Sequence, residues 1–267
     1  MMKPSQCSSC AEQAIPSVVV VGLASCFGCQ LQITNQEQYL TDVLGRFDLK
    51  YWQLTSSEPM PEDFSVAIIE GAVTTAEALE QVKELREKAD TIITIGACAN
   101  TAGIPGMASD GFDRRIGEVY DTLPEACGDI IAPRAVKDVI DVDFEVLSCP
   151  IDFYEFAQVL SAALLGSNRA RRSTTMCAEC KRQENPCFYP QGEICLGLVT
   201  RGGCMARCPS LGRPCMGCRG LSPKANLDSA RESVKLFGLS SEEFERKLTI
   251  FNQTNEVLSS EGEGSHD

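Results

Sequence analysis

Histidine is nearly absent from this sequence, and the single one, His266, lies close to the C-terminus. A Ser-His-Asp triad or a zinc site of mixed Cys and His ligands therefore has no material here. Basic residues are also scarce, because 24 Lys and Arg stand against 37 Asp and Glu and leave a net charge of −13. That charge argues against nucleic acid or an anionic membrane surface as a partner. We predict neither.

Long hydrophobic runs are missing as well. No apolar stretch reaches the roughly 20 residues of a membrane span. Residues 1–16 contain neither the apolar segment of a secretory signal nor a pair of arginines. Because 43% of the residues are hydrophobic, the chain can still bury a core. We therefore expect a globular protein in the cytoplasm.

Cysteine, by contrast, is abundant, with 15 in 267 residues. A cytosolic protein of this size seldom forms disulfides, because the glutathione pool keeps thiols reduced. Metal binding is the more direct explanation for so many thiols. Since histidine is almost absent, the ligands must be thiolates.

The first part of the chain, from Ser17 to about Leu165, alternates short β-branched runs with amphipathic stretches. This pattern is typical of βαβ units and predicts an α/β protein with a doubly wound parallel sheet. The expected strands are Val18–Val21, Lys50–Leu54, Val66–Ile69, Thr91–Ile95 and Phe144–Leu147. Apolar residues at helical spacing predict helices at Thr75–Ala89 and Ile151–Leu165.

The composition changes abruptly after Gly166. The segment Cys177–Cys218 has eight cysteines in 42 residues and no clear periodicity, so we expect bound clusters, rather than an apolar core of its own, to hold it. Beyond Pro223 a helical pattern returns, with Ser240 and Glu243 in capping-box spacing. The expected divisions are a sheet domain at 16–166, a largely irregular cysteine-bearing domain at 167–222, C-terminal helices at 223–258 and a disordered tail at 259–267.

Four cysteines follow predicted strands at the point where each strand ends. Cys26 and Cys29 follow the first strand. Cys98 follows the fourth and Cys149 the fifth. The carboxyl ends of parallel strands form one edge of such a sheet, where ligands bind, and four thiolates from three converging loops suit a [4Fe–4S] cluster. The alternative is that Cys98 and Cys149 are only small buried hydrophobic residues.

The loop after the first strand lacks a phosphate-binding motif. It has neither a G-x-G-x-x-G nor a Walker pattern, which argues against a nucleotide or flavin at this edge. Glu70 ends the third strand and is expected to point into the same crevice. Its carboxylate is either a solvated loop group or a residue that supports the cluster or relays protons beside it.

The eight cysteines of the second half can be divided into two groups of four. Each group contains one C-x2-C pair, and the groups are Cys177, Cys180, Cys187 and Cys195, then Cys204, Cys208, Cys215 and Cys218. Two further [4Fe–4S] clusters are the simplest interpretation. Two structural four-cysteine zinc sites would use similar spacing and remain an alternative. Cys195 and Cys204 could also exchange groups without breaking a spacing rule.

Three cysteines are left over. Cys7 and Cys10 form another C-x2-C pair, and Cys127 stands alone. Two thiols do not complete a site, so we interpret Cys7 and Cys10 as inert, with completion by a partner as the alternative. Cys127 is expected to be a core residue rather than a ligand.

The cysteine motifs resemble those of a known family over roughly residues 16–220. The family is the small subunit of nickel–iron hydrogenases, in particular its soluble deazaflavin-non-reducing, sulfhydrogenase and NAD(P)- or ferredoxin-linked types. The resemblance rests on the motifs Ser25–Cys29, Gly96–Cys98 and Ser148–Pro150. It implies a flavodoxin-like fold and a proximal cluster, bound next to the large subunit's nickel–iron site, whose ligands would be Cys26, Cys29, Cys98 and Cys149.

Two later segments carry the resemblance further. Cys195–Cys204 is similar to the family's join between distal and medial clusters, and Pro214–Cys218 to the end of the medial site. By this likeness the first group of four binds the distal cluster and the second group the medial one. Membrane-bound and periplasmic members have a histidine where Cys177 stands and a proline in place of a fourth medial cysteine. Because this chain offers Cys208, the resemblance implies a four-iron medial cluster in a low-potential enzyme of the cytoplasm.

The resemblance implies conduction rather than hydrogen cleavage. The chain would be the non-catalytic small subunit of a hydrogenase, with three [4Fe–4S] clusters between a large subunit and a flavin or iron–sulfur partner. The cluster-bearing subunit of complex I has the same fold, but it has adjacent cysteines in its first loop and one cluster. An electron-transfer subunit of a quinone reductase is thus a less favoured alternative, as is a zinc-stapled interaction module.

Overall fold

The computed structural model describes residues 15–36, 45–123, 125–167, 174–255 and 257–258. Cys7, Cys10, His266 and the tail expected at 259–267 lie outside these ranges. Below, residues 16–166 are the sheet domain and the described residues from 174 onward are the C-terminal region.

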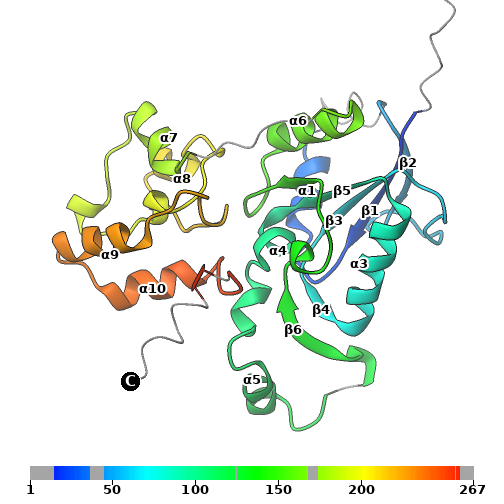
Figure 1. Cartoon of the computed structure of the whole chain (residues 1–267), viewed down its shortest axis with the longest axis horizontal. Coiled ribbons are helices and arrows are strands. Elements are labelled where there is room, and N and C mark those ends of the chain that lie inside the picture. Colours follow the sequence, from blue (N-terminus) through cyan, green and yellow to red (C-terminus); the bar gives the residue numbers. More distant parts are fainter. Residues whose placement is uncertain (1–14, 37–44, 124, 168–173, 256, 259–267) are drawn as a thin grey trace, which may run out of the picture.

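Five parallel strands form the central sheet, in the order β2-β1-β3-β5-β7 (Figure 1). They are β1 (Ser17–Gly22), β2 (Asp48–Trp52), β3 (Val66–Glu70), β5 (Thr91–Ile95) and β7 (Phe144–Val146). All five predicted strands are confirmed, although β2 begins two residues earlier than expected. With β1 inside the sheet and later strands added outward on one side, this is the predicted flavodoxin-like, doubly wound order.

Both faces of the sheet are covered, because alternate residues of its strands enter different hydrophobic cores. Val18 of β1 belongs to one core and its neighbour Val19 to the other. Helices α1 (Gly28–Thr34) and α6 (Phe153–Leu164) cover the first face, and α3 (Ala76–Lys88) covers the second. The helices predicted at 75–89 and 151–165 are therefore confirmed as α3 and α6.

Shorter elements complete the sheet domain. A two-stranded antiparallel sheet, which the sequence pattern did not predict, pairs β4 (Val73–Thr75) with β6 (Ile130–Arg134). The remaining elements are α4 (Gly96–Thr101), α5 (Phe112–Val119) and the 3-10 turns η1 (Pro105–Ala108), η2 (Glu125–Cys127) and η3 (Val136–Asp138).

The C-terminal region lies beside the sheet domain, with its helices gathered on the left of Figure 1. Its elements are α7 (Met176–Arg182), η4 (Tyr189–Gln191), η5 (Leu196–Leu198), α8 (Arg207–Ser210), α9 (Leu227–Leu236) and α10 (Ser241–Thr249). The predicted cap is present, since the Ser240 side chain accepts a hydrogen bond from the Glu243 N–H at 3.1 Å. The helical pattern beyond Pro223 is confirmed.

The C-terminal region has a hydrophobic core, to which the cysteine-rich stretch and the late helices both contribute. Met176 and Leu196 of the cysteine-rich stretch pack in one core with Val234 of α9 and with Phe244 and Leu248 of α10. The sequence pattern missed this core because its two halves come from segments that look unrelated, one irregular and one helical. The late helices complete what the cysteine-rich stretch could not build alone.

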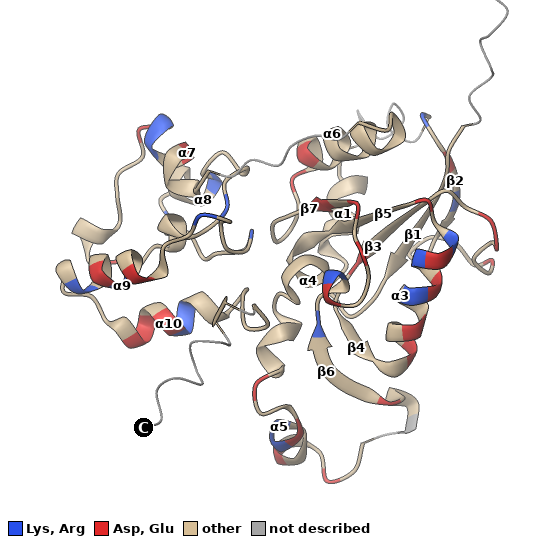
Figure 2. Cartoon of the chain, in the orientation of Figure 1, with Lys and Arg blue, Asp and Glu red and all other residues tan. Residues whose placement is uncertain are grey.

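Charged side chains of both signs lie along α3, α5, α9 and α10 (Figure 2). In the described part of the chain, no helix is both long enough and apolar enough to span a bilayer.

Candidate metal centre

The four cysteines expected at the strand ends lie at the carboxyl edge of the sheet. Cys29 lies in the first turn of α1, Cys98 in α4 directly after β5, and Cys26 and Cys149 in the loops after β1 and β7. Burial, followed by the charges of Cys149 and Cys26, raises the pKa of Cys98 to about 11. Burial and the charge of Glu70 raise the pKa of Cys29, with a smaller contribution from Cys149. The structure thus brings the four thiols within electrostatic reach of one another.

Backbone contacts hold the loops together around these thiols. The N–H of Ala97 donates to the carbonyl of Ser148 at 2.9 Å, which joins the loop after β5 to the loop after β7. Gly96 has a φ of +83°, and a Cβ at this position would collide with the sulfur of Cys29. Glycine alone adopts this backbone conformation readily and leaves room for the sulfur.

This donor set fits an iron–sulfur cluster. Ionising neighbouring thiols, of which Cys29 is buried, is costly in a bare protein, whereas a bound metal centre supplies the positive charge that stabilises thiolates. Among the described residues, no three Cys, His, Asp or Glu side chains lie close enough together to hold a single metal ion.

Glu70 is a buried positioning group and not a solvated loop carboxylate. It is the last residue of β3 and is 1% exposed. Its carboxylate accepts hydrogen bonds from the backbone N–H groups of Cys29 (3.1 Å) and Gln30 (3.4 Å). The carboxylate therefore fixes the start of α1, and with it the backbone that carries Cys29.

A second group of thiols surrounds α7 in the C-terminal region. Cys177 and Cys180 lie on that helix, while Cys187 and Cys195 come from the loops that follow it. Burial and then the charges of Cys195, Cys180 and Cys187 raise the pKa of Cys177 to about 12. Burial also raises the pKa of Cys195, and the charges of Cys180 and Cys187 add to that rise. Cys195 thus lies near Cys177, and its sulfur also accepts a hydrogen bond from the backbone N–H of Cys215 at 3.2 Å.

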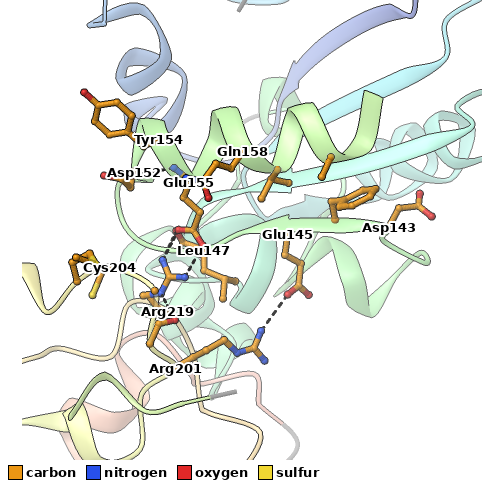
Figure 3. A pocket seen from close by; sticks show the side chains of 16 residues that line it. Asp143, Glu145, Leu147, Asp152, Tyr154, Glu155, Gln158, Arg201, Cys204 and Arg219 are labelled. Carbon is orange, nitrogen blue, oxygen red and sulfur yellow. Dashed lines mark hydrogen bonds and ion pairs between the residues drawn. The ribbon is translucent and has the colours of Figure 1, made fainter. Parts of the chain in front are cut away.

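Two of the last four thiols, Cys208 and Cys215, lie near Cys218. Burial raises the pKa of Cys208, and the charge of Cys218 adds to the effect. Burial also raises the pKa of Cys215 well above its ordinary value, with added contributions from the charges of Cys195 and Cys218. Cys204 lines a cavity of about 520 Å³ between the sheet domain and the C-terminal region (Figure 3).

Two contacts connect the three groups in a row. The hydroxyl of Ser148, next to Cys149, lies 3.6 Å from the sulfur of Cys218. At the other end, the backbone N–H of Cys215 donates to the sulfur of Cys195 at 3.2 Å. The group around Cys218 therefore lies between the sheet-edge group and the α7 group.

One cysteine is placed differently from the expectation. Cys127 is exposed in η2, so the prediction that it is a core residue is wrong. The short turn that carries it lies before β6, and its side chain does not enter the cores of the sheet domain.

The sequence reasoning also missed polar groups between the two regions. The buried Arg219 forms an ion pair with Glu155 of α6, and Ser148 reaches Cys218 from the sheet domain. The only feature of the sequence that could have pointed to these two residues is their place in the chain. Arg219 directly follows the candidate ligand Cys218, and Ser148 directly precedes the candidate ligand Cys149.

Comparison with known proteins places this architecture. The family described as NADH ubiquinone oxidoreductase, 20 Kd subunit, matches residues 26–163. Sulfhydrogenase 2 subunit delta of Pyrococcus furiosus is 32% identical over 87% of this chain and 97% of its own length. A subunit of the F420-non-reducing hydrogenase of Methanothermobacter marburgensis is 33% identical over 78% of this chain and 80% of its own.

Solved structures share the fold. A chain of an NAD+-reducing [NiFe]-hydrogenase in the H2-reduced state superposes with a TM-score of 0.53 at 20% identity, covering 58% of this chain and 94% of that one. A chain of the [NiFeSe]-hydrogenase of Dm. baculatum gives a TM-score of 0.56 at 16% identity, covering 77% and 94%.

The fold and its thiols define the class: α/β proteins with a flavodoxin-like sheet, cysteines at its carboxyl edge and a cysteine-rich region after it. The chain belongs to the family of nickel–iron hydrogenase small subunits. The resemblance seen in the motifs is therefore confirmed. The family of the 20 Kd subunit corresponds to the complex I subunit that the sequence analysis disfavoured. Its match is confined to the sheet domain, whereas the two hydrogenase subunits match most of the chain.

Proposed function

We propose that this small subunit conducts electrons through three [4Fe–4S] clusters, between the nickel–iron site of a large subunit and a flavin or iron–sulfur partner. The names of the relatives, a sulfhydrogenase and an F420-non-reducing hydrogenase, support hydrogen as the substrate of the complex. In this proposal the chain is not catalytic itself. We also propose a cytoplasmic location, which fits the free thiols of the described cysteines.

The observation that carries the proposal is the order of the thiol groups. The sheet-edge group meets the Cys218 group at Ser148, and the Cys218 group meets the α7 group where Cys215 contacts Cys195. Iron–sulfur clusters held at these three places would supply one-electron redox centres. Such an order gives a proximal, medial and distal succession.

The ligands follow from the same grouping. We propose Cys26, Cys29, Cys98 and Cys149 for the proximal cluster, Cys204, Cys208, Cys215 and Cys218 for the medial cluster, and Cys177, Cys180, Cys187 and Cys195 for the distal cluster. Glu70 would hold the backbone of one proximal ligand, and a proton-relay role for this carboxylate remains part of the proposal.

The surface beside the proximal group supports a protein partner there. Cys26 and Cys149 are exposed. Three apolar side chains are exposed there. They are Leu31 on α1, Ile104 after α4 and Met107 in η1, and each exposes 42–49% of its surface. Exposed apolar side chains beside exposed candidate ligands suit a face that a large subunit covers.

Metal and sulfide content tests the proposal. The chain is purified anaerobically, alone and with its co-purifying partners, and iron, sulfide, zinc and nickel are measured. About twelve irons and twelve sulfides per chain, with nickel only in the partner, are expected for three cubes. About four irons and two zincs would instead make the C-terminal region a zinc-stapled module and end the three-cluster relay.

Activity separates the remaining alternative. The match to the family of the 20 Kd subunit of NADH ubiquinone oxidoreductase leaves a quinone reductase subunit as the alternative function. The purified complex should reduce a redox dye with hydrogen. Dye reduction by another donor, with none from hydrogen, would favour the quinone reductase.

A further inference from the structure

An ion pair between the buried Arg219 and the partly exposed Glu155 joins the sheet domain to the C-terminal region. Both terminal nitrogens of Arg219 donate to the carboxylate of Glu155, each at 2.7 Å. The guanidinium also donates to the carbonyls of Gly202 (3.2 Å) and Leu147 (3.4 Å). The Arg219 side chain is only 3% exposed, so its charge is fixed in place and largely shielded from water.

The Arg219 side chain lies beside the backbone next to one proposed medial ligand and directly follows another in the chain. Arg219 directly follows Cys218 in the chain, and its side chain passes over Gly203, which directly precedes Cys204. A Cβ at Gly203 would collide with the guanidinium, so the backbone beside Cys204 is open to this side chain. Figure 3 shows Arg219 and Cys204 on the wall of the same cavity, with dashed lines from Arg219 to Glu155.

The charges of these groups act on one another. Burial raises the pKa of Cys204, while the backbone N–H of Arg207 and the guanidinium of Arg219 lower it. Burial alone would lower the pKa of Arg219. The hydrogen bonds and charge of Glu155 outweigh that effect and raise the pKa, and the charges of Cys204 and Cys218 raise the pKa further. The positive charge of Arg219 therefore acts on the thiol of Cys204.

Stability is a weak explanation for such a pair. Desolvation of a buried ion pair offsets much of its attraction, and apolar residues of similar volume often stabilise a fold as well or better. A fixed cation beside a redox centre has a direct effect instead, because it stabilises the form that carries the extra electron, and weak screening inside a protein enlarges that effect.

We propose that Arg219, oriented by Glu155, raises the reduction potential of the medial cluster and thereby sets its level relative to the proximal and distal clusters. This inference rests on the proposed three-cluster relay. It assigns Arg219 to tuning the medial cluster and Glu155 to positioning Arg219.

Redox titration followed by electron paramagnetic resonance tests this on the complete complex. The medial signal is first identified in a Cys208→Ala variant, in which loss of a ligand is expected to alter that cluster alone. Arg219→Gln should then lower the equilibrium constant for reduction of the medial cluster about tenfold, which is equivalent to a fall of about 59 mV in its reduction potential for a one-electron couple. Glu155→Gln should shift it in the opposite direction, because the cation loses its neutralising partner. Arg219→Lys should retain most of the native potential.

Opposite shifts distinguish electrostatic tuning from a structural role, since loss of packing would disturb both variants alike. Arg231→Gln removes a matched pair with Glu245 (2.7 Å) between α9 and α10 and should leave the medial signal unchanged. Three intact clusters with no medial shift, or equal shifts in Arg219→Gln and Glu155→Gln, would overturn the inference alone. An iron content far below about twelve atoms per native chain would instead overturn the proposed three-cluster function on which this inference rests.

Discussion

The sheet domain and the C-terminal region place their thiols by different means. The strands β1, β5 and β7 end at the same edge of the sheet, with β3 between β1 and β5, and hydrogen-bonded strands fix where Cys29, Cys98 and Cys149 lie. In the C-terminal region, short helices and 3-10 turns carry the thiols, and left-handed residues such as Met205 and Ala206 turn the chain between them. The regular sheet thus positions the sheet-edge thiols, whereas a small core and local turns position the thiols of the C-terminal region.

Iron removal should separate the two regions most strongly. The sheet domain has a core on each face of its sheet, but the cysteine-rich stretch contributes only part of one core. We expect a chelated chain to lose amide hydrogen-exchange protection around Cys177–Cys218 while β1, β3 and β5 keep theirs. Equal loss in both regions would show that the sheet depends on metal just as much.

Phe244→Ala tests whether the core of the C-terminal region supports its thiols. Phe244 is fully buried in α10, and its truncation should cost about 3–5 kcal/mol of unfolding free energy. Denaturant unfolding measures the loss, and iron content should fall in the C-terminal region. Phe156→Ala, at a buried position of α6 in the sheet domain, is the matched control. Full iron retention in Phe244→Ala would mean that the clusters hold this region without the core.

Glu70→Gln tests how the sheet edge positions a thiol. The substitution keeps an acceptor but removes the charge that strengthens the bonds from the N–H groups of Cys29 and Gln30, which should cost about 1–2 kcal/mol. Thermal unfolding and the proximal cluster's spectrum report the change. Glu80→Gln, on the exposed face of α3, should alter neither. A native spectrum and stability in Glu70→Gln would remove the positioning role.

Lys247→Gln should have the smallest effect. A hydrogen bond and the charge of Lys247 lower the pKa of Glu243 from its ordinary 4.5. The pair's stabilisation is therefore present above pH 4.5 and is lost as the pH falls through the lowered value. Because the Glu243 carboxylate is exposed to solvent, we expect a slight destabilisation at pH 7 that disappears in strong acid and at high salt. Urea unfolding at both pH values measures it, and a pH-independent loss would contradict the assignment.

Much of the sheet domain could be predicted from sequence because its signals are local. The run at 66–69 is entirely apolar and the run at 91–95 is all β-branched, as strands covered on both faces favour, and both became central strands. A cysteine after such a strand must lie near the crevice, so the sheet-edge thiols could be placed without coordinates. The antiparallel pairing of β4 with β6 joins distant segments with weak patterns and was missed.

The fold class, the family and the residues available as ligands follow from the sequence alone, because periodicity and cysteine spacing are written along the chain. The three-dimensional arrangement was needed to show that Cys215 contacts the sulfur of Cys195, that Ser148 reaches Cys218, and that Arg219 pairs with Glu155 across 64 positions. These are contacts between segments far apart in the sequence. Folding both regions against each other creates them, and no local pattern encodes which side chains will meet.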